Sequence, residues 1–327
     1  MTGGGGLADL AWIGCDWGGS SLRVFAVAAD GRVLAVRRSD DGAGGLAPDG
    51  FEPALMALVA DWLPDAPPAA IRVLICGMAG SRTGWREAAY CDPDVPLTRL
   101  AAAAVAAPAL DRRIRPLILP GYARGDPPDV MRGEETQLLG LIGTEPGFAG
   151  LVCLPGTHSK WARIADDRLT ASATMMTGEI FALLARQSIL RQSLRPAAVL
   201  VDEAGFRAAV RQAMADPAAV LPAMFALRAA DLTGGGADPA GGDEGRADPE
   251  RAADRLSGLL IGLELAALPR TGWRAGEAVV VIGAPALAGR YAVALDACGI
   301  PARQVSGETL VIAGLRAAHA QMIAAGS

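Results

Sequence analysis

The residues of this chain that could do chemistry begin with a carboxylate at the end of an apolar run. Asp16 closes the run 11–16, and a second apolar run follows at 24–27. Between them lies a turn of small residues, which comprises Gly18, Gly19, Ser20 and Ser21. Two such runs predict a β-hairpin, and the N–H groups and hydroxyls of its turn can hold phosphate oxygens. Asp16 is then placed to bind Mg²⁺, which prefers one or two carboxylates together with substrate phosphates. A Gly-rich hairpin with a solvated carboxylate is the alternative.

A similar stretch returns in the second half of the chain. The apolar run 150–154 leads into a turn with Gly156, Thr157 and His158, and Lys160 follows in the returning strand. Two such hairpins indicate an internal structural repeat. Their separation along the sequence is far too long for the repeat of a solenoid. His158 either lines a cleft or contacts phosphate or sugar, and Lys160 either contacts phosphate or is a solvated strand residue. No Cys-x-x-Cys pair completes a zinc site around His158, and no G-x-S-x-G motif favours a hydrolase triad.

A pair of glutamates supplies the remaining candidate for acid–base chemistry. Glu134 and Glu135 follow Gly133 where the sequence predicts the start of a helix that ends near residue 142. Free N–H groups at a helix N-terminus stabilise a carboxylate, so the pair suits that position whether or not it is catalytic. Neighbours on a helix point about 100° apart, so only one of the two can face a substrate.

Composition limits the classes of protein to which this chain can belong. At 327 residues, it is longer than one hydrophobic core usually supports, so two domains are expected. A net charge of −5 argues against a general nucleic-acid binder. No apolar run is long enough for a transmembrane helix, and the N-terminus lacks the features of a signal peptide. Five scattered cysteines are typical of a reduced, cytoplasmic protein. Residues 1–9 are expected to be a disordered N-terminus and 233–250 a mobile low-complexity insertion.

Hydrophobic periodicity predicts mixed sheets covered by helices. Strands are expected at 11–16, 24–27, 33–37, 71–76, 114–119, 150–154, 162–164, 168–174, 278–282 and 302–305, and helices at 51–63, 97–107, from 177 onward, at 286–298 and at 308–324. A Gly/Pro-rich loop is expected at 120–128. The fold class is therefore α/β.

Read together, seven motifs resemble those of the 2-dehydro-3-deoxygalactonokinase family, which belongs to the actin, hexokinase and Hsp70 superfamily. They are CDWGGSSLR (15–23), ICGMAGSRTGW (75–85), VMRGEETQLLG (130–140), LPGTHSKW (154–161), MMTGEIFALL (175–184), LSGLLIGLE (256–264) and IGAPALAGRYAVAL (282–295). Their order is that of the family, and they extend over nearly the whole chain. One departure lies in the first turn, where Gly19 and Ser20 stand at the positions that usually include a Thr.

The resemblance implies a fold and an activity. The fold would be two ribonuclease-H-like domains of the actin-like ATPase type, at 10–145 on the substrate side and 146–327 on the nucleotide side, with a nucleotide cleft between them. The activity would be ATP- and Mg²⁺-dependent transfer of a phosphoryl group to the 6-hydroxyl of 2-dehydro-3-deoxy-D-galactonate in galactonate catabolism. Phosphoryl transfer needs positioning, charge neutralisation and a group that accepts the hydroxyl proton, and the residues above could supply each of these.

The resemblance also implies roles for particular residues. Glu134 or Glu135 would be the catalytic base, with Glu134 modestly favoured because it lies at the helix start, and Asp16 would hold the metal. Phosphates would contact the two turns and Arg23, and Gly283 would lie at the adenosine. The sugar acid would contact the loop residues Gly80, Ser81 and Trp85, and its carboxylate would need an arginine. Arg82, Arg132 and Arg228 are the candidates, and Arg82 is the most natural because its loop follows the carboxyl end of a strand.

Two other functions remain open at this point. A phosphatase or exopolyphosphatase-like hydrolase could use the same turns and glutamates on water, and a non-catalytic ATP sensor would need neither glutamate. Small-molecule partners are expected in each case, without nucleic acid or membrane. The sequence leaves open whether the chain forms a homo-oligomer.

Overall fold

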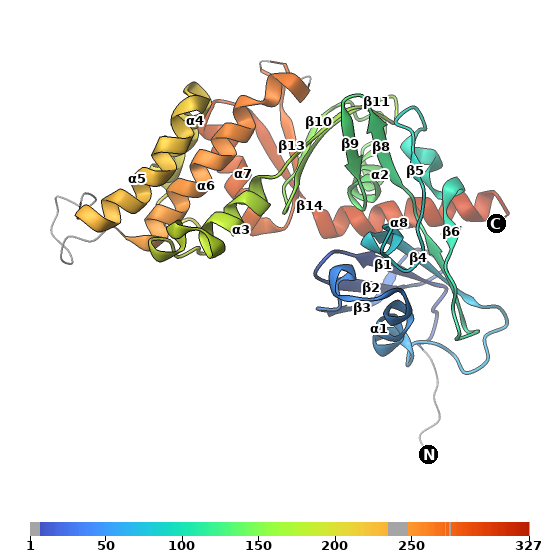
Figure 1. Ribbon diagram of the computed structural model, residues 1–327. Helices are drawn as coiled ribbons and strands as arrows, with labels where there is room; N and C mark the ends of the chain where they lie inside the picture. Colours follow the sequence, from blue (N-terminus) through green and yellow to red (C-terminus); the bar gives the residue numbers. More distant parts are fainter. Residues whose placement is uncertain (1–6, 235–247, 272, 275, 327) are drawn as a thin grey trace. The chain divides into compact units, whose positions relative to one another are not determined.

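The computed structural model describes residues 7–234, 248–271, 273–274 and 276–326. These residues form two compact units, each built on its own β-sheet (Figure 1). Unit 1 contains the chain up to Ala149, the short segment Ala165–Thr170 and the segment from Gly307 onward, and unit 2 contains Gly150–Ile164 and Ala171–Ser306. Within the described ranges, no helix is long and apolar enough to cross a membrane.

Unit 1 has a six-stranded sheet in the order β3-β2-β1-β4-β7-β6 and a small sheet in the order β5-β8-β9. The strands are β1 Trp12–Trp17, β2 Leu22–Val27, β3 Val33–Ser39, β4 Ile71–Gly77, β5 Tyr90–Cys91, β6 Val105–Ala106, β7 Ile114–Ile118, β8 Gly121–Gly125 and β9 Pro128–Met131. The helices are α1 Phe51–Val59, α2 Glu134–Thr144 and α8 Gly307–Ala324, with the 3₁₀ turns η1 Ala43–Gly45, η2 Pro48–Gly50, η3 Met78–Gly80 and η4 Leu97–Ala103.

Unit 2 has a five-stranded sheet in the order β12-β11-β10-β13-β14. Its strands are β10 Gly150–Leu154, β11 Ser159–Ala165, β12 Arg168–Met175, β13 Val279–Gly283 and β14 Ala302–Ser306. Its helices are α3 Thr177–Gln187, α4 Glu203–Ala215, α5 Val220–Thr233, α6 Pro249–Ala266 and α7 Pro285–Ala297, with the 3₁₀ turns η5 Ile189–Gln192, η6 Pro217–Ala219 and η7 Leu268–Thr271.

The two main sheets share one topology, which confirms the predicted repeat. In each, the first strand pairs antiparallel with the second and parallel with the fourth, and the fourth pairs parallel with the fifth. The third strand follows the second at the edge of both sheets. This order, 3-2-1-4-5, is that of ribonuclease-H-like domains, so the α/β fold class that the sequence indicated is confirmed.

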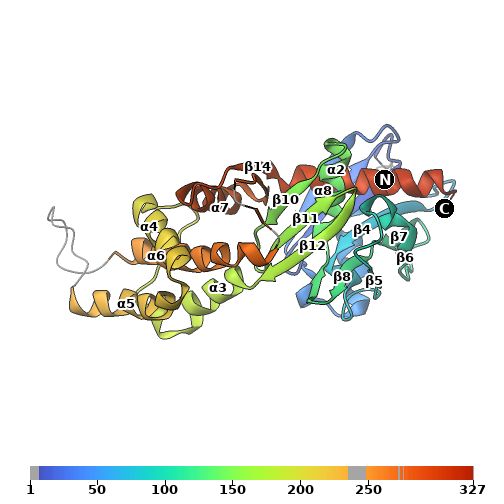
Figure 2. The same ribbon diagram turned by 90° about the horizontal axis from the view of Figure 1, so that it is seen from above.

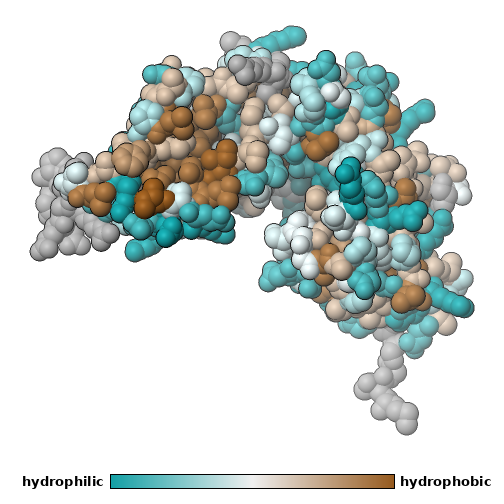
Figure 3. All heavy atoms as spheres, in the orientation of Figure 1, coloured by the Kyte–Doolittle hydropathy of each residue, from teal (hydrophilic) through white to brown (hydrophobic). Residues whose placement is uncertain are grey.

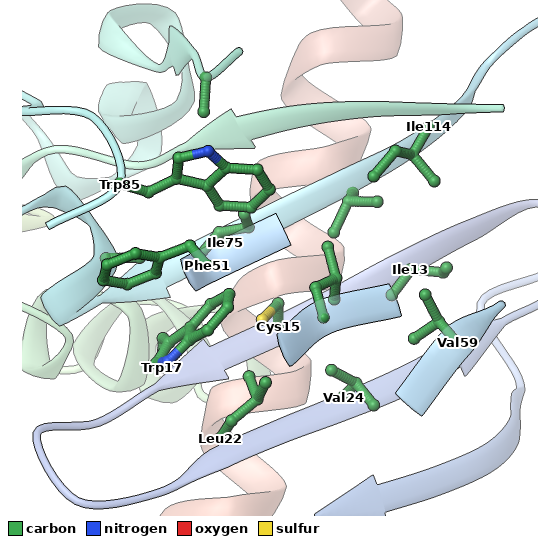
Figure 4. Packing of buried hydrophobic residues seen from close by; sticks show 14 of the residues in the cluster. Ile13, Cys15, Trp17, Leu22, Val24, Phe51, Val59, Ile75, Trp85 and Ile114 are labelled. Atoms are coloured by element: carbon green, nitrogen blue, oxygen red, sulfur yellow. The ribbon is translucent and has the colours of Figure 1, made fainter. Parts of the chain in front are cut away.

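The core of unit 1 is built around aromatic side chains from three separate segments of the chain (Figure 4). The ring centroids of Trp17 and Phe51 lie 4.8 Å apart, and those of Trp17 and Trp85 lie 6.1 Å apart with the rings nearly perpendicular. Both geometries are favourable for aromatic pairs. Trp85 was expected to contact the substrate, but the structure places it in this core, where its exposed fraction is 6%.

The last helix, α8, packs on α2, and both helices belong to unit 1 (Figures 1 and 2). Two glycines allow this close crossing, because a Cβ on Gly140 would lie 2.0 Å from the Leu310 carbonyl oxygen and one on Gly314 would lie 1.9 Å from that of Thr136. We expected the second domain to extend from residue 146 to 327. The structure instead ends unit 2 at Ser306, since the chain returns to unit 1 with α8.

Local elements differ from the expectations at three places. The helix expected at 97–107 is the 3₁₀ turn η4 followed by β6, and the loop expected at 120–128 contains β8 and the start of β9, which pair as a hairpin. Alanine richness favours a helix locally, but pairing of β6 with β7 overrides it. Of the expected disordered N-terminus, residues 1–6 lie outside the described residues, whereas the Leu7 N–H donates to the Trp62 carbonyl. Of the expected insertion, 235–247 likewise lie outside them.

Candidate active site

Asp16 lies near the end of β1, between two neighbouring strands. It is opposite Arg23 on β2 and Cys76 on β4, and the Cys76 thiol is 3.9 Å from its Oδ1. Burial raises the pKa of Asp16, and Arg23 and the Cys76 hydrogen bond partly oppose this rise. The carboxylate therefore lies in a site that would gain stability from an added positive charge.

Arg23 takes part in a cluster of charges that includes the start of α8. Its Nη1 lies 3.4 Å from Glu308, which also accepts hydrogen bonds of 2.6 and 2.7 Å from Arg38. Arg23 Nε is buried and has no hydrogen-bond partner among the described residues. The Nε–H group of Arg23 therefore remains available as a donor close to Asp16. The carboxylate of Glu308 offsets part of the positive charge of Arg23.

The first turn is supported from behind by the segment around η1. The Ala43 and Gly44 N–H groups donate to the carbonyls of Gly18 and Gly19. A Cβ on Gly42 would lie 2.3 Å from the Ser20 backbone, so glycine is required there. With these carbonyls bonded on one side, the exposed Ser20 and Ser21 remain accessible on the surface of the turn.

The first turn of α2 touches the end of β4. Gly77 and Gly133 both have positive φ, of 90° and 109°, and a Cβ on Gly133 would lie 3.3 Å from the Gly77 Cα. Gly77 follows Cys76, the β4 partner of Asp16. The two candidate glutamates therefore start their helix beside the strand ends that hold Asp16.

The two glutamates have different surroundings. Glu135 is fully buried and accepts the Gly133 N–H at 2.8 and 2.7 Å with its two oxygens. Burial, together with Glu134, raises the pKa of Glu135 to about 8. Glu134 is half-buried, and its Oε2 accepts the Arg132 N–H at 2.9 Å. Glu135 is thus enclosed by the protein, and Glu134 is the better placed of the two to meet a substrate.

Arg132 holds the loop that contains the other substrate candidates. Its guanidinium stacks over the Tyr90 ring at 4.2 Å and donates to the Ala88 carbonyl at 2.8 Å. A Cβ on Gly80 would lie 2.7 Å from its Nη1, so Gly80 makes room for the guanidinium. Arg132 therefore packs within the protein, whereas Arg82 is exposed on this loop and Ser81 is half-buried.

The second turn is fixed to the first turn of α3. The Glu179 N–H donates to the Thr157 carbonyl at 2.8 Å, and a Cβ on Gly178 would lie 2.3 Å from the Gly156 carbonyl oxygen. His158 is exposed, and its Nε2 lies 2.5 Å from a Glu179 carboxylate oxygen.

Lys160 and Arg228 are both engaged within unit 2. Lys160 is 7% exposed and donates to the Thr174 hydroxyl at 2.8 Å, so it is not a solvated strand residue. Arg228 lies on α5, where it donates to Asp231 at 2.8 Å and also to Ser193 and Gln192. The Arg228 guanidinium thus has internal partners in unit 2, whereas Arg82 belongs to unit 1.

A pocket of about 270 Å³ lies in unit 2 beside the second turn. Gly156 and Gly178 line it on one side, and the first residues of α7, Ala286 and Leu287, line it on another. Gly283 itself lies behind this turn, with its Cβ position 3.5 Å from the Pro155 ring. Figure 3 shows hydrophobic side chains gathered over the helices of this unit. The pocket offers a mostly apolar space next to the second turn.

Residues 16–318 match the family described as 2-keto-3-deoxy-galactonokinase. This chain belongs to that family. A Rhizobium meliloti protein named as a probable 2-dehydro-3-deoxygalactonokinase is 42% identical over 307 residues, which cover 93% of this chain and 94% of the relative. The 2-dehydro-3-deoxygalactonokinase of Escherichia coli is 32% identical over 314 residues, with 94% and 98% covered.

A solved structure supports the same membership. A crystal structure of a Sinorhizobium meliloti protein, provisionally named for the same enzyme, matches with a TM-score of 0.80 at 40% identity. The match covers 94% of this chain and 97% of that one. The resemblance inferred from the seven motifs to the 2-keto-3-deoxy-galactonokinase family is therefore confirmed.

Sequence reasoning missed three residues that the structure brings to the candidate sites of this family member. They are Cys76 beside Asp16, Glu308 beside Arg23 and Glu264 beneath the second turn. Glu264 carried a usable signal, because a lone carboxylate in the apolar run LSGLLIGLE indicates a buried partner. No sequence signal pointed to Cys76 or Glu308, because the residues that they contact are distant in sequence.

Replacing Glu135 by Gln should change how the stability of the protein depends on pH. The folded chain holds the Glu135 proton up to about pH 8, whereas the unfolded chain releases it near 4.5. The unfolded state binds fewer protons between these values, so this residue makes the free energy of unfolding fall as pH rises, by up to about 1.4 kcal/mol per unit. Glu135→Gln lacks this titration, and its stability relative to wild type should increase from pH 5 to pH 8. Urea unfolding at several pH values measures this, and parallel curves for the two proteins would contradict it.

Proposed function

We propose that this chain transfers the γ-phosphoryl group of ATP to the 6-hydroxyl of 2-dehydro-3-deoxy-D-galactonate, a step in the breakdown of galactonate. One observation carries the proposal. In a member of the 2-keto-3-deoxy-galactonokinase family, Asp16 and the Glu134 helix start lie at adjacent strand ends. The curated relatives bear the name of this kinase, which favours it over a phosphate hydrolase or an ATP sensor.

Glu134 is proposed as the general base for the sugar hydroxyl. Phosphoryl transfer requires little covalent chemistry from the protein beyond accepting this proton, aligning the oxygen and neutralising charge. Glu134 suits the first two tasks because its carboxylate is half-buried and held by the Arg132 N–H. Glu135 contributes by its hydrogen bonds to Gly133, which fix the start of the helix.

Asp16 is proposed as the protein's carboxylate for Mg²⁺. Within the described residues no group of three or more His, Cys, Asp or Glu could hold a metal ion. Mg²⁺ needs no such group, because it commonly binds one or two carboxylates and completes its shell with phosphates and waters. The raised pKa of Asp16 fits this role, because it reflects a buried carboxylate without a full positive partner. When bound, Mg²⁺ would neutralise charge on the phosphates.

The pocket in unit 2 is proposed to take the adenine of ATP. Apolar walls and small residues suit the faces of a purine ring, and the adjoining turn 156–158 would offer N–H groups to phosphates. We place the reaction in the cytoplasm, where ATP and sugar acids are available. A homo-oligomer remains open, and size-exclusion chromatography with light scattering would decide it.

Replacing Arg82 by Met should raise KM for the sugar acid by about 10- to 100-fold, because a charge-assisted hydrogen bond to a carboxylate contributes about 1.5–3 kcal/mol. Arg82 is the exposed arginine on the loop that follows β4. KM for ATP should stay within about two-fold of the wild-type value. Arg86→Met, which changes another exposed arginine four residues further along, is the matched control. Equal effects of the two substitutions would show that Arg82 does not bind the carboxylate.

A coupled assay that detects ADP tests the proposed function as a whole. The enzyme is mixed with ATP, Mg²⁺ and each member of a panel of six-carbon 2-keto-3-deoxy acids of both configurations at C4. Sugar-dependent ADP formation with a 6-phosphorylated product is expected, with the galactonate-derived acid preferred. Release of inorganic phosphate without any phosphosugar would indicate the hydrolase instead.

A further inference from the structure

Glu264 is a buried carboxylate in the apolar part of α6. Its exposed fraction is 3%, and leucine and isoleucine side chains surround it in the sequence. Its Oε1 accepts the Trp161 indole N–H at 2.7 Å, and its Oε2 accepts the Tyr291 hydroxyl at 2.8 Å. The Thr177 hydroxyl also bonds to it, and the Ser159 hydroxyl lies 2.6 Å from that of Tyr291. A charge in such a position needs a specific reason, because burying it without hydrogen bonds is costly.

Three side chains donate directly to this carboxylate. Its two oxygens offer about four lone-pair positions, and Trp161, Tyr291 and Thr177 each supply one donor. Burial raises the pKa of Glu264, and hydrogen bonds from neighbouring side chains only partly oppose this rise. The Tyr291 proton goes to Glu264, so the Ser159 hydroxyl, 2.6 Å from that of Tyr291, donates to the Tyr291 oxygen and joins the network. A single carboxylate thereby fixes the orientation of side chains from β11, α3 and α7.

These side chains surround the proposed nucleotide site. Ser159 directly follows the turn 156–158 and anchors it to the sheet. Thr177 opens α3, and both Thr177 and Tyr291 line the apolar pocket. The turn and the pocket wall are therefore both held by the hydrogen-bond network of Glu264.

We propose that Glu264 is a positioning residue of the nucleotide site. It holds the phosphate-binding turn and the wall of the base pocket in fixed positions relative to each other. The inference rests on the proposed function insofar as unit 2 binds ATP. Glu264 acts through Ser159, Thr177 and Tyr291 and does not touch the nucleotide itself. Its loss should weaken ATP binding selectively, because the sugar acid is assigned to residues of unit 1.

Glu264→Gln tests this by keeping the size of the side chain while exchanging one acceptor oxygen for an NH₂ donor. Trp161, Tyr291 and Thr177 donate to the group, so at least one of them loses its acceptor. We expect KM for ATP to rise about 10-fold or more, with KM for the sugar acid and kcat at saturating ATP within about three-fold of wild type. Tyr291→Phe removes one donor and should shift KM for ATP in the same direction by a smaller factor. Glu250→Gln, in the first turn of α6 and outside the pocket lining, is the matched control and should change neither constant.

Calorimetry with a non-hydrolysable ATP analogue, and thermal unfolding of each variant, separate the outcomes. A purely structural role would lower the unfolding temperature without a selective loss of nucleotide affinity, and that result would overturn the proposal. If Glu264→Gln fails to fold, the affinity of Tyr291→Phe for the analogue decides in its place, and unchanged affinity overturns the proposal. If wild type binds the analogue but phosphorylates no sugar acid, the proposed function fails while the Kd values still test Glu264. If wild type binds no nucleotide, both fail.

Discussion

Replacing Glu134 by Gln is expected to lower kcat by about 10²- to 10⁴-fold, the usual contribution of a general base. The amide cannot accept the proton of the sugar hydroxyl, although it keeps the size of the side chain and an oxygen for the Arg132 N–H. KM for ATP should change little, because Glu134 is assigned to the reacting hydroxyl and not to the nucleotide. Steady-state kinetics with both substrates varied would measure the two constants.

Glu135→Gln is the matched control for this prediction. With a pKa of about 8, Glu135 is mostly protonated at pH 7, so a neutral amide resembles its native form. The control should therefore keep most of its kcat at pH 7. A loss of less than a few-fold in Glu134→Gln would place the base elsewhere, and a larger loss in Glu135→Gln than in Glu134→Gln would reverse the assignment of the two residues.

Asp16→Asn should reduce activity by at least about 10²-fold while the fold remains intact, because an electrostatic contribution to the transition state is worth several kcal/mol. The amide carries no charge for Mg²⁺, although its shape matches that of the carboxylate. Since burial raises the pKa of Asp16, the neutral side chain should not destabilise the protein without ligand. The unfolding temperature of the free variant should therefore equal or exceed that of wild type.

Activity titrated against Mg²⁺ would distinguish the causes of such a loss. The apparent affinity for Mg²⁺ in the presence of ATP should fall in Asp16→Asn, together with turnover. Asp30→Asn, at the exposed turn between β2 and β3, serves as the control and should behave as wild type. Wild-type turnover of Asp16→Asn at saturating Mg²⁺ would show that the metal does not depend on this residue.

The sequence by itself determined the elements whose signals are local. Alternating apolar runs joined by a turn of small residues predicted both hairpins, and the register of β1 with β2 places Asp16 at the strand end as expected. The start of α2 at Glu134 was equally readable, because Gly133 and the carboxylates mark a helix N-terminus. The motifs then indicated the family, since their order along the chain needs no knowledge of packing.

The tertiary structure alone decided which side chains meet. Trp85 was expected at the substrate, but it packs against Phe51 in the core, and the half-buried Arg132 stacks over Tyr90. The return of α8 to unit 1 and the gathering of donors from Trp161, Tyr291 and Thr177 on Glu264 depend on elements that are far apart in sequence. The difference between Glu134 and Glu135 has the same origin. The identity of a residue fixes which interactions it can make, but only the packing of distant segments fixes its burial, and burial sets its pKa and its access to a substrate.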